Sequence, residues 1–143
     1  AAFGLVQLKK LRQNLRKREI NFNLHTKFLK KYTEYFILPK QLPGSRSGWL
    51  AYPITINDKA PFSRTQMQIF LEKKNIQTRV VFTGNILRQP GFKYIKAKKN
   101  KNGYPEADKV MKNGILLACH HGLTSKMIKH IHRSIEEFIL KYS

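Results

Sequence analysis

Two arginines that flank a tight turn form the strongest candidate site for an anion. The segment Thr78–Pro90 carries Arg79 in a run typical of a strand, then Gly84 and Asn85, then Arg88. Gly84 permits a sharp change of backbone direction, and a guanidinium fork matches the geometry of a carboxylate or a phosphate. We therefore predict that Arg79, Asn85 and Arg88 bind a substrate anion, a carboxylate or a diphosphate. Structural salt bridges are the competing interpretation, although acidic partners are scarce in this sequence.

The tripeptide Cys119-His120-His121 suggests thiol or metal chemistry, but its spacing argues against both. Neighbours on a strand point to opposite faces, so Cys119 and His120 do not form a pair of nucleophile and base. His130 and His132 diverge by about 200° on a helix, so they do not complete a zinc site. We expect no catalytic residue and no metal ligand in this chain. Cys119 is predicted to be a small core residue, with the two histidines in a strand-to-helix turn.

Charge is the most unusual feature of the composition. The 143 residues include 28 lysines and arginines against 8 acidic residues, a formal charge of +20. Such an excess of positive charge favours polyanionic partners, and the lysine-rich loop over residues 93–103 could bind phosphates. A solvated basic surface is the competing interpretation, and it is favoured because aromatic residues for base stacking do not recur regularly in this loop.

The remaining composition is that of an ordinary globular domain. Hydrophobic residues make up 41% and charged residues 25%, which excludes wholesale disorder. The single cysteine excludes an internal disulfide and points to a reducing compartment. No apolar run approaches the ~20 residues of a membrane helix, and no secretory signal opens the sequence. We expect a cytoplasmic protein without a membrane partner.

The element that opens the sequence is predicted to be one long helix. Apolar residues recur at seven-residue intervals, at Leu8, Leu15, Phe22, Leu29 and Phe36. This spacing is helical, so we predict a helix from about Ala2 to Tyr35. Such a helix is on the order of 50 Å long, whereas a compact chain of this size is about 35–40 Å across. Its apolar N-terminal half needs another surface, and we expect the chain to be part of a larger architecture.

The residues after this helix have the pattern of a small α/β unit. Alternating apolar residues predict a strand over 50–56, in which Pro53 indicates an edge strand or a bulge. Ser63 begins a helix through a capping box with Gln66. The further elements are a strand within 76–82, a short helix from Pro105 to Gly114, a strand over 115–118 and a last helix capped by Thr124 or Ser125. The predicted fold class is α/β, a long helix followed by β-α-β-(helix)-β-α.

Several of these segments resemble one enzyme superfamily. Ala1–Leu11 is similar to the interdomain helix of the sugar aminotransferase/dehydratase superfamily, the DegT-like enzymes with the aspartate-aminotransferase fold. Segments 49–55, 78–90, 107–111 and 122–124 follow in matching order. Thr78–Pro90 is the most specific of them. It resembles the nucleoside-diphosphate-4-keto-6-deoxyhexose 3-dehydratases of lipopolysaccharide biosynthesis.

The resemblance covers nearly the whole chain but only the C-terminal part of such enzymes. It implies an interdomain helix over residues 1–37 and a small α/β domain over 38–143, as in fold-type I pyridoxal phosphate enzymes. The parent enzyme would use pyridoxal or pyridoxamine phosphate, held by a large domain, so we expect no cofactor bound by this chain alone and no Schiff-base lysine in it. The parent would be a homodimer, with an iron–sulfur reductase as a further partner. Arg79, Asn85 and Arg88 would face the nucleotide-sugar pocket.

Several functions stay open on the sequence alone. The first is the C-terminal domain of a dehydratase that removes the C3 hydroxyl of a nucleotide-linked 4-keto sugar. The second is the same domain of a nucleotide-sugar aminotransferase. A basic module that binds nucleic acid is an alternative of another class, which rests on the charge of +20. A truncated gene product without a function of its own is the last.

Overall fold

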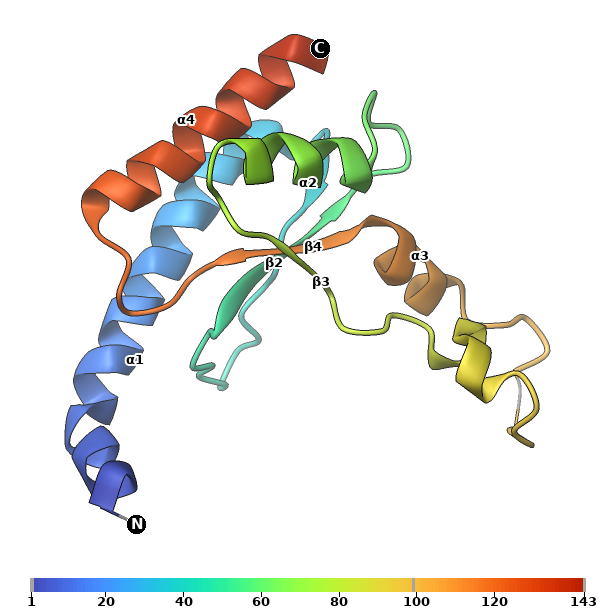
Figure 1. The fold of residues 1–143 in the computed structure, drawn as a ribbon, viewed down its shortest axis with the longest axis horizontal. Coiled ribbons are helices and arrows are strands. Elements are labelled where there is room, and N and C mark those ends of the chain that lie inside the picture. Colours follow the sequence, from blue (N-terminus) through green and yellow to red (C-terminus); the bar gives the residue numbers. More distant parts are fainter. Residues whose placement is uncertain (1, 99, 143) are drawn as a thin grey trace.

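The computed structural model describes residues 2–98 and 100–142, so Ala1, Lys99 and Ser143 lie outside the described residues. Figure 1 shows the arrangement of the elements. The helices are α1 (Ala2–Leu29), α2 (Arg64–Lys73), α3 (Pro105–Asn113) and α4 (Ser125–Tyr142). The strands are β1 (Phe36–Ile37), β2 (Ala51–Ile56), β3 (Arg79–Val80) and β4 (Gly114–Ala118). Short 3-10 turns lie at Lys30–Tyr32, Ile86–Arg88 and Pro90–Phe92.

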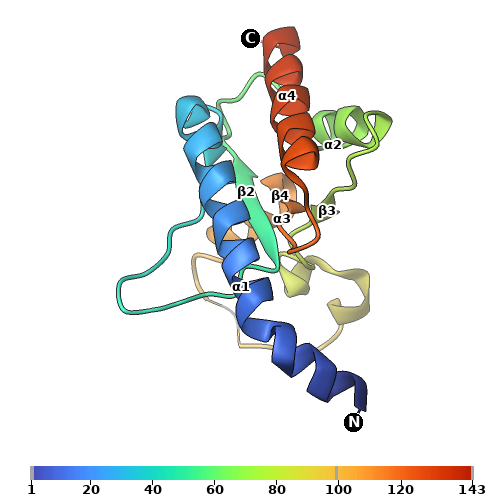
Figure 2. The same ribbon diagram turned by 90° about the vertical axis from the view of Figure 1, so that its left-hand side faces the viewer.

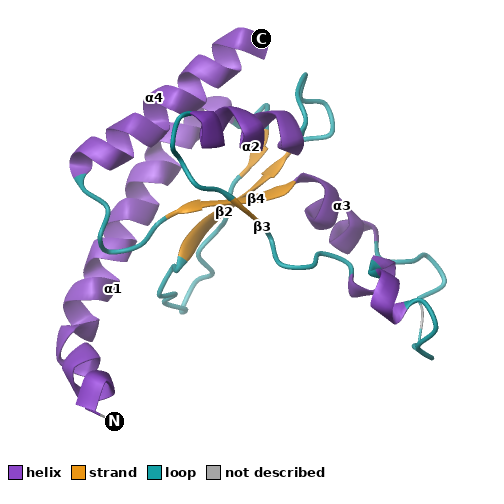
Figure 3. Cartoon of the chain, viewed as in Figure 1, coloured by secondary structure: helices purple, strands orange, loops and turns teal. Residues whose placement is uncertain are grey.

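The strands form an antiparallel sheet in the order β1-β2-β4-β3, at the centre of Figure 3. β2 pairs with β4 along five residues, whereas β1 reaches only Thr55 and Ile56 of β2. Pro53 was expected on an edge strand or at a bulge, but β2 lies between β1 and β4 in the sheet. Since β1 stops short of Pro53, the strand is paired only with β4 at this residue. The missing N–H of proline is tolerated there for the same reason as on a true edge.

The core lies between the sheet and the helices α1, α2 and α4. Residues alternate along β2, so that Tyr52, Ile54 and Ile56 are buried while their neighbours are half-buried. In Figure 1, α2 and α4 lie on the same side of the sheet, and the apolar stripe of α4 faces the core. The buried apolar side chains from these helices are Phe22, Leu29, Met67, Leu71, Ile128, Ile131, Ile135, Phe138 and Ile139.

The long first helix overhangs the rest of the molecule, as the sequence predicted. Figures 1 and 2 show the N-terminal half of α1 projecting away from the sheet. The helix buries residues only in its C-terminal half, whereas Phe3 is 88% and Leu8 64% exposed. The helix ends at Leu29 rather than near Tyr35, because the chain tightens into a 3-10 turn and then forms β1. β1 is a strand that the sequence analysis did not predict.

The other predicted elements are present with small shifts. Ser63 and Gln66 form the expected capping box, and Pro105 begins α3. The strand expected within 76–82 is reduced to Arg79–Val80. Thr124 caps α4 by accepting a hydrogen bond from the Met127 N–H. None of the helices within residues 2–98 and 100–142 is long and apolar enough to cross a membrane.

Candidate functional site

The turn that follows β3 is fixed by contacts inside it and with α3. Gly84 has a positive φ of 63°, and a Cβ at this position would collide with Cβ of Met111. Only glycine combines that backbone conformation with so close an approach. The side-chain amide of Gln89 donates to the Thr83 carbonyl at 3.0 Å and ties the two ends of the turn. The turn is therefore preorganised.

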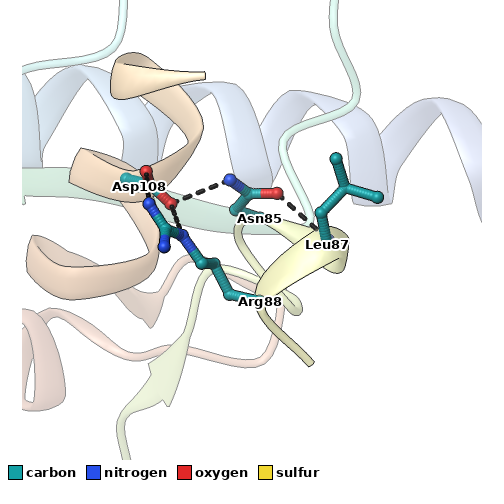
Figure 4. A network of polar contacts seen from close by, with 4 residues as sticks. All are labelled: Asn85, Leu87, Arg88 and Asp108. Carbon is teal, nitrogen blue, oxygen red and sulfur yellow. Dashed lines mark hydrogen bonds and ion pairs between the residues drawn. The ribbon is translucent and has the colours of Figure 1, made fainter. Parts of the chain in front are cut away.

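Asn85 and Arg88 meet on one carboxylate, that of Asp108 in α3 (Figure 4). Asn85 is 6% exposed; its Oδ1 accepts from the Leu87 N–H, and its Nδ2 donates to Asp108 Oδ1 at 2.8 Å. Arg88 donates through Nε to Oδ1 at 3.1 Å and through Nη2 to Oδ2 at 2.9 Å. Arg88 and Asp108 thus form a bidentate pair, and Asn85 adds a third hydrogen bond.

This network sets the charges of its members. The hydrogen bonds from Arg88 and then from Asn85 hold the pKa of Asp108 below its ordinary value. The hydrogen bonds to Asp108 in turn raise the pKa of Arg88. Both groups stay ionised at neutral pH, so the turn carries a cation with a fixed orientation.

The pair with Asp108 uses only one edge of the Arg88 guanidinium. The Nη1 group takes no part in it, and the Arg88 side chain is 65% exposed. The geometry therefore lets Arg88 donate to an additional anion through Nη1 while Asp108 fixes the plane of the fork. The expected shortage of acidic partners is wrong at this position. Asp108 lies 20 residues from Arg88 in sequence, and its location in the first turn of α3 was the one signal that could have singled it out.

The structure does not bring Arg79 into this network. Arg79 lies on β3, where it is exposed and pairs with Leu116 of β4. It lines a pocket of about 730 Å³ between β3, β4 and the first turns of α4. The predicted trio is thus divided, with Asn85 and Arg88 on Asp108 and Arg79 at a separate pocket.

Cys119 and the two following histidines lie where the sequence placed them. Cys119 is fully buried after β4, and burial raises the pKa of its thiol to about 11. The thiol is therefore protonated and unreactive at neutral pH. His120 and His121 are exposed in the turn that leads to α4. Among the described residues there is no group of three or more His, Cys, Asp or Glu side chains placed to hold a metal ion.

A buried pair of histidines, His25 and His132, escaped the sequence analysis. His25 is fully buried, and its Nε2 lies 3.0 Å from the Ala118 carbonyl. Its Nδ1 lies 3.0 Å from Nε2 of His132, which stacks on Phe28. The two residues are 107 positions apart. Because a carbonyl can only accept, His25 carries its proton on Nε2 and accepts the hydrogen bond from His132.

Sequence and fold comparisons relate this chain to a set of sugar enzymes. The model of the DegT/DnrJ/EryC1/StrS aminotransferase family matches residues 1–136. The lipopolysaccharide biosynthesis protein RfbH of Salmonella typhimurium is 30% identical over 138 residues, which are 96% of this chain and 31% of that protein. The dTDP-4-dehydro-2,6-dideoxy-D-glucose 3-dehydratase of Saccharopolyspora spinosa is 35% identical over 107 residues, 75% of this chain and 23% of the relative.

An aminotransferase is also among the relatives. The dTDP-4-amino-4,6-dideoxy-D-glucose transaminase of Escherichia coli is 30% identical over 131 residues, 92% of this chain and 35% of the relative. The chain thus spans about a third or less of the length of these relatives.

The fold agrees with these relatives. The structure of E. coli GDP-4-keto-6-deoxy-D-mannose-3-dehydratase with bound hydrated PLP superposes with a TM-score of 0.83 at 24% identity, covering 93% of this chain and 33% of that one. The long helix and small sheet are those of a segment of such enzymes, which confirms the predicted fold class. The match over residues 1–136 decides the family. The chain belongs to the DegT/DnrJ/EryC1/StrS aminotransferase family.

Proposed function

We propose that this chain is the C-terminal part of an enzyme that removes the C3 hydroxyl of a nucleoside-diphosphate-4-keto-6-deoxyhexose, in lipopolysaccharide or related deoxysugar synthesis. The observation that carries this proposal is the 35% identity with a sugar 3-dehydratase. The similarity to RfbH, named for lipopolysaccharide biosynthesis, supports the same pathway class. In this proposal residues 1–37 lead from a larger domain, and residues 38–143 form the small domain of a homodimeric enzyme.

The exposed apolar face of α1 supports the proposal of a larger domain. Phe3, Leu5 and Leu8 are each more than 60% exposed. Burial of apolar side chains of this size is favourable, because it removes apolar surface from water. A covering surface would remove them from water, and a large domain that continues from the helix is such a surface. We propose that contact between this face of α1 and the large domain holds the small domain in place.

Arg88 is the residue that we propose to contact the substrate directly. Its bidentate pair with Asp108 orients the guanidinium, and the Nη1 edge would donate to a phosphate oxygen of the nucleotide. Asn85 would act as a positioning residue, because its polar atoms are already used by Asp108 and the Leu87 N–H. The proposed substrate contact of Arg79 stays a prediction, since it lies apart from this network.

The 730 Å³ pocket does not offer the pair of groups that holds pyridoxal phosphate in enzymes. That cofactor is held in enzymes by a Schiff-base lysine and by a group that pairs with the pyridine nitrogen. No carboxylate is among the described residues that line the 730 Å³ pocket, and its one lysine, Lys126, is exposed. We therefore assign no cofactor ligand in this chain, and propose that the cofactor is held by another part of the enzyme.

An aminotransferase of the same family is the second candidate. The E. coli transaminase, 30% identical over 92% of this chain, favours it. The two reactions differ at the sugar, because dehydration removes oxygen from C3 whereas transamination places nitrogen at C4.

Product analysis tests the proposal and separates the two candidates. The polypeptide to use is the longest one encoded in frame with this chain, incubated with cofactor, glutamate and a dTDP- or GDP-linked 4-keto-6-deoxyhexose, with and without an iron–sulfur reductase and its electron donor. We expect a product without the C3 oxygen, identified by mass and by the new methylene signals in its NMR spectrum. An amine at C4 would instead establish the aminotransferase. Conversion of neither kind with either nucleotide would refute both, and the isolated 143-residue chain, which we expect to be inactive, is the control.

A further inference from the structure

The chain between β3 and α3 forms a lobe that extends beyond the sheet, away from α4 (Figures 1 and 2). Its tip segment, residues 92–98, is exposed at every residue. Large apolar and aromatic side chains lie in this segment, where Phe92 is 38%, Tyr94 87% and Ile95 53% exposed. Several such side chains so close together on a surface indicate an interaction site.

The same part of the lobe is strongly basic. The exposed lysines in the tip segment or just after it are Lys93, Lys96, Lys98 and Lys101. None of them forms an ion pair with a carboxylate within residues 2–98 and 100–142. The sequence also has no acidic residue between Glu72 and Glu106, so nothing nearby along the chain neutralises this charge. The lobe therefore attracts an anionic partner.

Hydrogen bonds give the tip segment a defined shape. The Phe92 carbonyl accepts from the Ile95 N–H at 3.3 Å, which closes a turn around the apolar residues. The Tyr104 hydroxyl donates to the Lys98 carbonyl at 3.2 Å and ties the two arms of the loop together. Because the segment is ordered in advance, less conformational entropy is lost when it binds a partner.

The residue types favour a lipid surface over a nucleic acid. Nucleic-acid sites rely on arginine forks and on aromatic rings that stack on successive bases. The loop over residues 93–103 has no arginine, and Ile95 has no ring to stack on a base. Tyrosine and lysine side chains suit the interface of an anionic bilayer, where rings lie among the headgroups and lysine stems reach the lipid phosphates.

We propose that the tip segment binds the surface of a membrane that contains anionic phospholipids. Phe92, Tyr94 and Ile95 enter the headgroup region, and the lysines contact lipid phosphates. The two contributions act together, because a small apolar anchor or a basic patch alone gives only marginal binding. The expectation of no membrane partner rested on the absence of a long apolar run, which a surface loop does not need. The proposal does not depend on the enzymatic function proposed above.

Sedimentation with lipid vesicles tests this proposal, at an ionic strength of about 0.15 M so that long-range attraction is screened. The probes are vesicles of phosphatidylcholine alone and vesicles in which about a third of the lipid is phosphatidylglycerol. We expect the 143-residue chain to bind the anionic vesicles about tenfold more tightly than the neutral ones, or more. Binding to neither kind of vesicle, or equal binding to both, would overturn the proposal.

Apolar variants separate insertion from attraction by charge alone. The double variant Tyr94→Ser, Ile95→Ser keeps the net charge and should weaken binding to the anionic vesicles about tenfold or more. Leu140→Ser is the matched control, since it removes a side chain that is 73% exposed on α4, and it should leave binding unchanged. The proposal fails if the double variant binds as tightly as this control.

Charge variants separate a local site from the general charge of the chain. Lys96→Gln combined with Lys98→Gln should weaken binding about tenfold or more, because each lysine close to an anionic surface contributes about fivefold. Lys59→Gln combined with Lys73→Gln removes the same charge at exposed positions outside the lobe and should weaken binding about twofold at most. Equal losses for the two pairs would show that no local site exists.

A fluorescent label reports insertion directly and tests the rival partner. The single cysteine, Cys119, is buried, so Ile95→Cys can be labelled selectively with an environment-sensitive dye. The emission of the dye should shift to the blue on anionic vesicles, whereas the same dye at Leu140→Cys should not respond. Single-stranded RNA of mixed sequence is the rival. If Tyr94→Ser abolishes binding of this RNA and leaves vesicle binding unchanged, the surface is a nucleic-acid site and the proposal is wrong.

Discussion

Acid should destabilise this chain through the pair His25–His132, which joins α1 to α4. His132 donates one hydrogen bond of 3.0 Å to Nδ1 of His25, and His25 donates its single ring N–H, at Nε2, to the Ala118 carbonyl. His25 must be neutral, because protonation at its Nδ1 would set two donors against each other, whereas His132 keeps its Nε2 hydrogen bond in either state and is disfavoured as a cation mainly by burial. Burial is the main cause that lowers the pKa of both histidines, and it lowers the pKa of His132 from 6.5 to about 4.

The size and direction of the effect follow from proton linkage. Between pH 6.5 and 4 the unfolded chain binds a proton at His132 that the folded chain does not, so the free energy of unfolding falls as the pH falls. A shift of this size corresponds to about 3 kcal/mol, at about 1.36 kcal/mol per pH unit. Since His132 is only partly buried, solvent screening reduces this to about 2 kcal/mol. Of the nearby charges, Lys31 lowers and Glu136 raises the pKa of His132.

Urea unfolding at pH 7 and at pH 4.5, followed by circular dichroism, measures this loss. The variant His132→Gln keeps an amide donor for His25 Nδ1 but has no titrating group, so it should lose about 2 kcal/mol less than the wild type between these two pH values. The exposed His121→Gln is the matched control and should keep the wild-type dependence. Glu136 and Asp108 have lowered pKa values and so act mainly below this range. If His132→Gln loses as much stability as the wild type, the reasoning about the pair is refuted.

Three further predictions concern positions in the fold. Gly84→Ala should lower the free energy of unfolding by about 2–3 kcal/mol in urea titrations, because its Cβ meets Met111 at a positive φ; an unchanged midpoint would contradict the described turn. Ser63→Ala should cost about 1 kcal/mol in the same assay, because the capping box with Gln66 is lost, whereas Ser63→Asp should keep most of the stability. Cys119 should react with a disulfide reagent at neutral pH only as fast as the chain unfolds, since burial raises the pKa of its thiol to about 11; rapid labelling of the folded chain would count against this account.

Local patterns were sufficient to predict most elements of the fold. The seven-residue spacing located α1, the alternation over 50–56 located β2, and Ser63 located the start of α2. Each of these signals lies within a few residues of the element that it specifies. The short strands β1 and β3 carry no such signal, since two residues make no period, and they form only because a neighbouring strand pairs with them.

The candidate site was predictable only in part, because its contacts join distant segments. The turn and its two polar residues were visible in the sequence, whereas the carboxylate that joins them is on another helix. The sequence also could not show that Arg79 lies outside the network of Asn85, Arg88 and Asp108, since alternation on β3 fixed the face of Arg79 but not what lies beside it. The pair His25–His132 had no local signal, because a buried histidine in an apolar stripe looks like any other core position.

The most direct test of the central claim, that α1 holds this domain onto a larger enzyme, is hydrogen exchange at the amides of residues 3–12. The isolated chain is compared with the longest polypeptide encoded in frame with it. In the isolated chain these amides should exchange quickly, because every residue of this part of the helix is exposed and an exposed helix end frays. In the longer polypeptide they should be protected about a hundredfold or more, as covered helices are. Equally fast exchange in both would contradict the claim that the apolar face of α1 is covered by a further domain.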